Sequence, residues 1–190
     1  MMFYIHGDTT LTVEGTDSGG LVIQGMDARD KTNASHYRTV FRVGVKAGDN
    51  ARLVLNDGVT ITGNYAESNG GVALVYGAVE MNGGIVDGNK TTGTGGAFQL
   101  ATGAFMEMNG GMIRNNYSGS NGGAIRISTG AEMILNGGML IENESEGTGG
   151  AVFLQGKLTV NGGEVVANKA EKNGGAIQLA DDAVLVVTGG

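Results

Sequence analysis

The chain repeats itself about every 26 residues, and this period constrains its fold more than any other feature. Each repeat carries an aliphatic residue, an asparagine three positions later, and a Gly-Gly pair beginning six positions after the asparagine. Successive asparagines are separated by 25, 27, 27 and 25 residues: Asn64, Asn89, Asn116, Asn143 and Asn168. A fixed period of this length is typical of a solenoid, in which each unit buries its apolar side only against its neighbours.

Each repeat contains three short segments in which apolar and polar residues alternate, such as Val79-Glu80-Met81. Alternation with a period of two, bounded by Gly and Asn, indicates β-strands. Recurrent Gly pairs and the lack of a 3.6-residue period argue against helix. We therefore predict an all-β fold, a right-handed parallel β-helix (solenoid) of about seven turns of three short strands, with repeats of 25–27 residues.

The alternation also predicts which side chains fill the core. Apolar residues of the second segment should point inward and stack from turn to turn: Val79, Met81, Met106, Met108, Met133, Leu135, Leu158 and Val160. The length differences between repeats all fall between the first and second segments. We expect a surface turn there, because such a turn absorbs length changes without disturbing the stacked core.

The N-terminal third follows the same pattern less regularly. Met26 stands at the position of the ladder asparagine, and residues 27–37 form a polar insertion. We expect residues 1–190 to be a single β-helix domain. Neither end carries a polar cap, so we expect the chain to be a segment of a longer surface protein and to self-associate through unpaired strand edges.

Composition excludes several classes of protein. Gly is 37 of 190 residues but Pro is absent, which excludes collagen, and 41% hydrophobic with 16% charged residues excludes disorder. The net charge of −7 argues against nucleic acid as a partner. The lack of Cys excludes zinc–thiolate sites, and no apolar stretch is long enough to predict membrane insertion.

Several short motifs resemble the right-handed β-helix repeats of large bacterial surface proteins. They are Gly-Gly-Ala-Ile at residues 122–125 and 174–177, Met-Asn-Gly-Gly at 81–84 and 108–111, and the aliphatic-x-x-Asn pattern. The resemblance is nearer to adhesin-like proteins of gut bacteria than to the polymorphic membrane proteins of chlamydiae, because this chain has no Cys and no Phe at the aliphatic position. It implies an extracellular or cell-surface location and a surface, adhesive or scaffolding role, and it transfers no catalytic residue.

The repeated asparagines predict a ladder. An Asn at a sharp turn can adopt a left-handed conformation and bond to nearby backbone. When such residues stack at the same position, each side-chain amide can donate to the carbonyl of the next, which satisfies both groups when they are buried. We predict a buried structural ladder rather than a ligand site.

Few residues suggest catalysis. Glu80 and Glu107 stand 27 residues apart at the same outward position. Two carboxylates that close could serve a retaining glycosidase or hold a cation. No Arg, His or aromatic residue joins the pair, so we interpret them as part of a solvated face. His6 and His36 have no partner at a readable spacing, and Asp181 and Asp182 fall in the variable turn. We therefore predict no catalytic, cofactor-binding or metal-binding residue, and no cofactor.

Outward positions of the C-terminal turns are unusually apolar and indicate an interaction surface: Ile134, Met139, Ile141, Phe153 and Val166. The alternative is that a neighbouring segment of a longer protein covers these residues.

The predicted function is a non-enzymatic structural or adhesive β-helix module of a bacterial surface or secreted protein, with a protein or glycan ligand on a host or neighbouring cell. The alternatives are a carbohydrate-active β-helix, such as a polysaccharide lyase, glycosidase or phage tailspike, and a self-assembling filament subunit.

Overall fold

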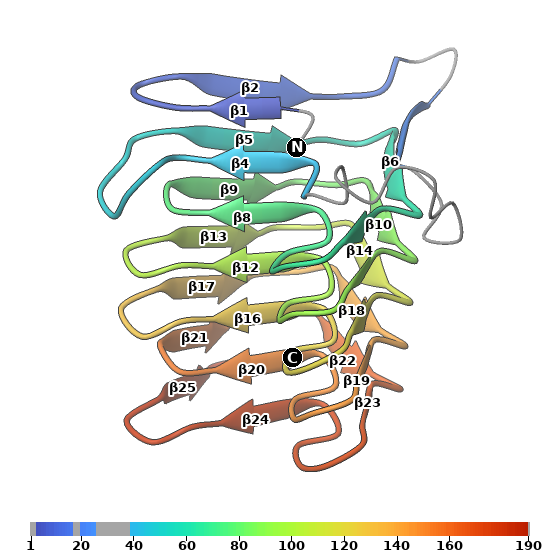
Figure 1. Ribbon diagram of the computed structural model, residues 1–190, viewed down its shortest axis with the longest axis vertical. Helices are drawn as coiled ribbons and strands as arrows, with labels where there is room; N and C mark the ends of the chain where they lie inside the picture. Colours follow the sequence, from blue (N-terminus) through green and yellow to red (C-terminus); the bar gives the residue numbers. More distant parts are fainter. Residues whose placement is uncertain (1–2, 17–19, 26–38, 190) are drawn as a thin grey trace.

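The computed structural model is a parallel β-solenoid, and it describes residues 3–16, 20–25 and 39–189 (Figure 1). The predicted insertion at 27–37 and the Met26 ladder position lie outside these residues. Every regular element in the described part is a strand, and no helix there is long and apolar enough to cross a membrane. The all-β solenoid predicted from the sequence is therefore confirmed, while its right-handed sense stays a prediction.

Two sheets of three- and four-residue strands run along the solenoid, and each strand pairs in parallel with its counterparts one turn away (Figure 1). The first sheet comprises β1 (Phe3–Ile5), β4 (Phe41–Val43), β8 (Ala73–Val75), β12 (Phe98–Leu100), β16 (Ile125–Ile127), β20 (Val152–Leu154) and β24 (Ile177–Leu179). The second sheet comprises β2 (Thr10–Val13), β5 (Arg52–Leu55), β9 (Ala78–Met81), β13 (Phe105–Met108), β17 (Glu132–Leu135), β21 (Lys157–Val160) and β25 (Val184–Val187).

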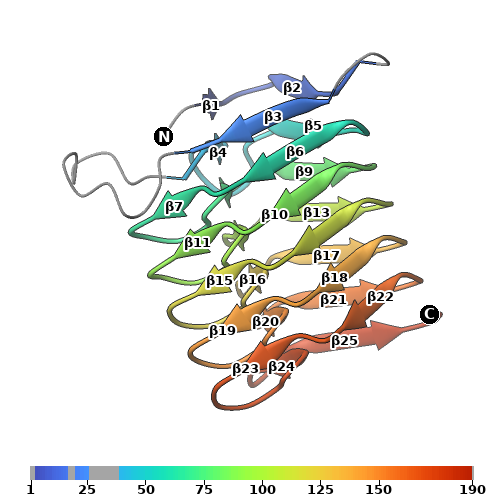
Figure 2. The same ribbon diagram turned by 90° about the vertical axis from the view of Figure 1, so that its right-hand side faces the viewer.

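Two further sheets close each turn, and both face the viewer in Figure 2. The third sheet comprises β3 (Leu21–Gln24), β6 (Val59–Thr62), β10 (Ile85–Asp87), β14 (Met112–Arg114), β18 (Met139–Ile141) and β22 (Glu164–Val166). The fourth sheet comprises β7 (Tyr65–Ala66), β11 (Lys90–Thr91), β15 (Tyr117–Ser118), β19 (Glu144–Ser145) and β23 (Lys169–Ala170).

The number of strands and turns differs from the prediction. The sequence predicted three strands per turn, but each complete turn has four, because the two residues after each ladder asparagine form the short strands of the fourth sheet. Two residues are too few to show an alternation. The prediction of seven turns rested on the number of first-sheet strands. Among the described residues, about five turns carry all four strands, from β4–β7 to β20–β23.

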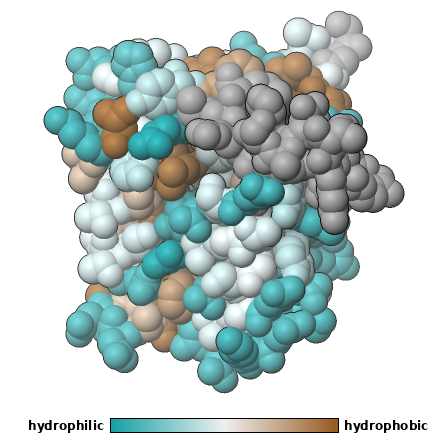
Figure 3. Space-filling model, viewed as in Figure 1, coloured by the Kyte–Doolittle hydropathy of each residue, from teal (hydrophilic) through white to brown (hydrophobic). Residues whose placement is uncertain are grey.

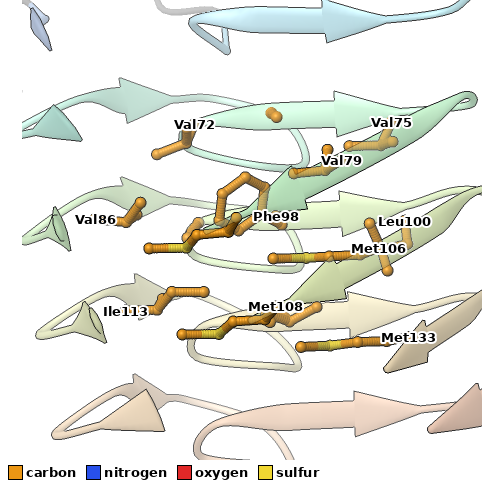
Figure 4. Close-up of a cluster of buried hydrophobic side chains, with 14 of the residues drawn as sticks. Val72, Val75, Val79, Val86, Phe98, Leu100, Met106, Met108, Ile113 and Met133 are labelled. Carbon is orange, nitrogen blue, oxygen red and sulfur yellow. The ribbon is translucent and has the colours of Figure 1, made fainter. Parts of the chain in front are cut away.

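The core fills the inside of the solenoid with one layer of side chains per turn, as Figure 4 shows around Phe98 and Met106. All eight second-sheet residues predicted to point inward are buried, with exposures from 0% to 9%. Outward neighbours such as Glu107 are half-buried or exposed, so the predicted register is confirmed. Fully burying a side chain of this size stabilises the fold by about 1.5–3 kcal/mol, and these rows repeat that contribution in every turn.

The Gly-Gly pairs lie where the chain passes from the fourth sheet to the first. Gly95 has a φ of +66°, a left-handed conformation that glycine adopts without steric penalty. A Cβ on Gly96 would lie 2.0 Å from the carbonyl oxygen of Gly123 in the next turn. The first glycine is therefore required by backbone conformation and the second by close stacking of turns.

Candidate functional site: ladders and outward rows

The inner ladder, which consists of Asn64, Asn89, Asn116, Asn143 and Asn168, joins consecutive turns where the third sheet meets the fourth. Asn116 is typical and fully buried: its Nδ2 donates to Oδ1 of Asn143 and to the carbonyl of Val86, both at 3.0 Å. Its Oδ1 accepts from Nδ2 and from the backbone N–H of Asn89, again at 3.0 Å. The other amides bond to one another at 2.7–3.0 Å. The predicted ladder is present, and its amides bond to both side-chain and main-chain groups, although Oδ1 of Asn64 at its start has no partner among the described residues.

The left-handed residue of this turn is not the ladder asparagine itself. Positive φ values occur one residue earlier, at Gly63, Gly88, Asn115, Glu142 and Ala167. In the last two of these turns the residue is neither Gly nor Asn: Glu142 has a φ of 54° and Ala167 a φ of 53°. Such a conformation costs a non-glycine residue about 1–2 kcal/mol. The left-handed conformation that an Asn at a sharp turn can adopt is therefore found at Asn115 and not at the ladder residue Asn116.

A second stack of asparagines, which we call the outer ladder, follows the second sheet. It consists of Asn56, Asn82, Asn109, Asn136 and Asn161. Each Nδ2 after that of Asn56 donates to the Oδ1 of the preceding asparagine at 2.8–3.1 Å, and Thr188 donates to Asn161 at 2.7 Å. Of these five residues, only Asn82 and Asn109 belong to the Met-Asn-Gly-Gly motifs of the sequence, and the ladder was not predicted. Their constant offset from the second segment is the signal that could have identified the ladder.

Glu80 and Glu107 are cross-strand partners on β9 and β13, flanked in their row by Val54 and Ile134, as predicted. The prediction that no basic residue joins them is wrong, because Arg52 Nη2 forms an ion pair with Glu80 Oε2. The Arg52 hydrogen bond, assisted by Asn82, lowers the pKa of Glu80 below its usual range. Glu107 accepts a hydrogen bond from Asn136 at 3.0 Å. Both carboxylates are therefore held by neighbours in adjacent turns.

The predicted interaction surface is divided among three faces of the solenoid. Met139, Ile141 and Val166 lie together on the third sheet, where Ile141 and Val166 are in register. Ile134 lies on the second sheet and Phe153 on the first. Val166 is 38% exposed, and the others are half-buried. The structure therefore brings three of the five residues together and separates the other two.

Outward rows of the third and fourth sheets carry charged and aromatic pairs between turns. Arg114 Nε lies 3.3 Å from Asp87 on the third sheet. On the fourth sheet Lys169 donates to Glu144 at 2.6 Å, and this hydrogen bond raises the pKa of Lys169. Tyr117 donates to Glu146, and that hydrogen bond, with burial, raises the pKa of Tyr117 to about 12.

The remaining titratable candidates lie at two places. His6 is exposed, and its ring lies 5.3 Å from that of Tyr4, whereas His36 falls outside the described residues. Asp181 and Asp182 rim an open hollow of about 280 Å³, beside Glu132. The Gln155-Gly156 turn, which lines the hollow, is shorter than the turns on either side of it. Nowhere in the described ranges are three His, Asp or Glu residues grouped to hold a metal ion.

Comparison with protein-family models, with curated proteins and with solved structures found no match to this chain.

Proposed function

We propose that this chain is a non-enzymatic structural and adhesive module, a stiff solenoid that presents its faces to a partner. The observation that carries the proposal is that polar side chains join each turn to the next. The two ladders do so at two corners, and ion pairs such as Arg52–Glu80 and Arg114–Asp87 do so on two of the faces. A rod cross-linked in this way holds its outward rows at the fixed strand spacing of about 4.8 Å.

We place the module at a bacterial cell surface or outside the cell, because its repeats resemble those of large surface proteins. A protein or a glycan on a host or neighbouring cell is the expected ligand. Adhesion suits a molecule whose polar groups are largely engaged with one another, since its exposed rows keep one geometry when a partner binds.

A carbohydrate-active β-helix is the second candidate, and the juxtaposition of Glu80 and Glu107 favours it. Glycosidases need one carboxyl group with a raised pKa to act as the general acid. The ion pair with Arg52 lowers the pKa of Glu80 instead, which suits a structural role better.

The test is an assay for cleavage. The chain is incubated with neutral and acidic polysaccharides, and new reducing ends and unsaturated products are measured. The matched control is a variant with both Glu80→Gln and Glu107→Gln. We expect no product above the control. Cleavage that the double substitution abolishes would contradict the proposal and establish the second candidate.

A further inference from the structure

The arginines of the described residues fall into two groups. Arg52 on the second sheet and Arg114 on the third each form an ion pair with a carboxylate, Glu80 and Asp87 respectively. Arg42 and Arg126 both lie on the outward row of the first sheet. Within the described part of the chain, no carboxylate lies at ion-pair distance from either of these two. Among the described residues, the first-sheet face of this protein with a net charge of −7 therefore carries two arginines that form no ion pair.

Arg126 is held by neutral groups only. Its Nη2 donates to Gln155 at 2.6 Å, its Nη1 donates to Thr94 at 3.4 Å, and its guanidinium carbon lies 6.0 Å from the centre of the Phe153 ring. Its Nε is buried without a hydrogen-bond partner, and burial lowers the pKa of the guanidinium. Because arginine stays charged in proteins, this is a partly desolvated cation, and it has no counter-ion among the described residues. Desolvated charges of this kind are characteristic of sites that bind ligands.

Arg42 repeats this arrangement further along the rod. Its guanidinium carbon lies 5.1 Å from the centre of the Tyr76 ring, and its Nε is also buried without a partner. Arg42 and Arg126 are separated by the strands β8 and β12, which is three strand spacings or roughly 14 Å.

The row between and beyond the two arginines contains no acidic residue. In register it reads Tyr4, Arg42, Leu74, Gln99, Arg126, Phe153 and Gln178. Figure 3 views the molecule from this side and shows hydrophilic and hydrophobic residues intermixed along the stack. The row runs parallel to the axis of the solenoid, so its cations, aromatic rings and amides form a linear array.

We infer that this first-sheet face binds a linear acidic polysaccharide, with Arg126 and Arg42 each receiving a carboxylate or sulfate group. Guanidinium groups form strong charge-assisted hydrogen bonds with such anions. Phe153 supplies an apolar platform beside Arg126, and the amides of Gln155 and Gln178 are suited to sugar hydroxyls. The acidic charge of the whole protein opposes any densely charged polyanion, which favours an acidic polysaccharide with widely spaced charges over nucleic acid. The inference rests on the proposed adhesive function, because it assigns binding without cleavage to this face.

The test measures binding of the 190-residue chain to polygalacturonate, heparin, dextran and single-stranded poly(dT) by calorimetry at low and moderate salt. Arg126→Gln and Arg42→Gln are compared with Arg52→Gln and Arg114→Gln, which remove the same charge from other faces. We expect polygalacturonate or heparin to bind and dextran not to bind. Each first-sheet substitution should weaken binding about tenfold or more, and each control substitution less than about threefold.

Thermal melts check that the variants fold, and Arg42→Gln tests the face independently if Arg126→Gln does not fold. Equal affinity of all four variants for an acidic polysaccharide would overturn the inference, as would tighter binding of poly(dT) or no binding of either acidic polymer. Cleavage products in the same mixtures would instead defeat the proposed function, so the two failures can be told apart.

Discussion

The inner and outer ladders stack the same residue at nearly the same spacing in opposite environments. Amide-to-amide distances are 2.7–3.0 Å in the inner ladder and 2.8–3.1 Å in the outer one. Asn116 is fully buried and also bonds to main-chain groups, whereas Asn109 is exposed. Water can replace a lost partner only at the exposed site. The comparison teaches that the repeat sets the geometry of a ladder, while burial sets its contribution to stability.

The largest effect on stability is expected from a substitution at Met108. This residue immediately precedes the outer-ladder residue Asn109, but its side chain points into the core. Met108→Ala leaves a cavity among fully buried neighbours and should lower the free energy of unfolding by about 2–4 kcal/mol. Urea denaturation measures the loss, and Glu107→Ala, which truncates the outward neighbour, is the control and should change stability by less than about 0.5 kcal/mol. Equal losses from the two substitutions would mean that the register of β13 is wrong.

The next effect tests the inner ladder directly. Asn116→Ala removes Oδ1 from two donors of Asn89 and leaves the carbonyl of Val86 without its side-chain donor. Because these groups are buried, we expect a loss of about 1–3 kcal/mol in a urea melt. Asn168→Ala is the matched control. Because Asn168 is only half-buried, this substitution should lower the free energy of unfolding by less. A neutral result at Asn116 would refute the structural role of the ladder.

Burial also explains how much of the molecule could be predicted from its sequence. The inner ladder and the core rows follow from spacing because a buried column must repeat its residue type in every turn. The outer ladder was missed because an exposed Asn before a Gly pair is explained equally well by turn preference. An exposed stack of residues can vary in residue type from turn to turn, because water can satisfy its polar groups. The sequence pattern of such a stack is therefore ambiguous.

Contacts that cross the rows diagonally were beyond prediction. Arg52 is in register with Ala78, yet its guanidinium reaches Glu80 two residues further along β9. The alternation of apolar and polar residues assigns each residue to an inward or an outward row. It gives neither the rotamer of a long side chain nor the side of the solenoid on which each sheet lies. For the same reason Ile134 and Phe153 were predicted to share a surface although they lie on different sheets.

A smaller effect, of opposite sign, concerns the turn that precedes the inner ladder. Ala167 holds a φ of 53° where two earlier turns place glycine. Ala167→Gly should therefore raise the free energy of unfolding by about 0.5–1 kcal/mol, because the relief of the left-handed conformation exceeds the greater chain entropy of glycine. Ala170→Gly, three residues later in β23, is the control and should lower stability by a similar amount. A loss at both positions would contradict the conformation of this turn.

The smallest effect should come from the outer ladder, and it is the one that decides whether burial explains the difference. Asn109→Ala removes an amide that donates to Asn82 at 2.9 Å and accepts from Asn136 at 2.8 Å. Both partners are exposed, so water can take the place of Asn109 and the loss should be less than about 0.5 kcal/mol in the urea melt used for Asn116→Ala. If Asn109→Ala costs as much as Asn116→Ala, cooperativity along the stack rather than burial would determine the strength of both ladders. The double variant distinguishes these cases, because independent ladders give additive losses and coupled ladders do not.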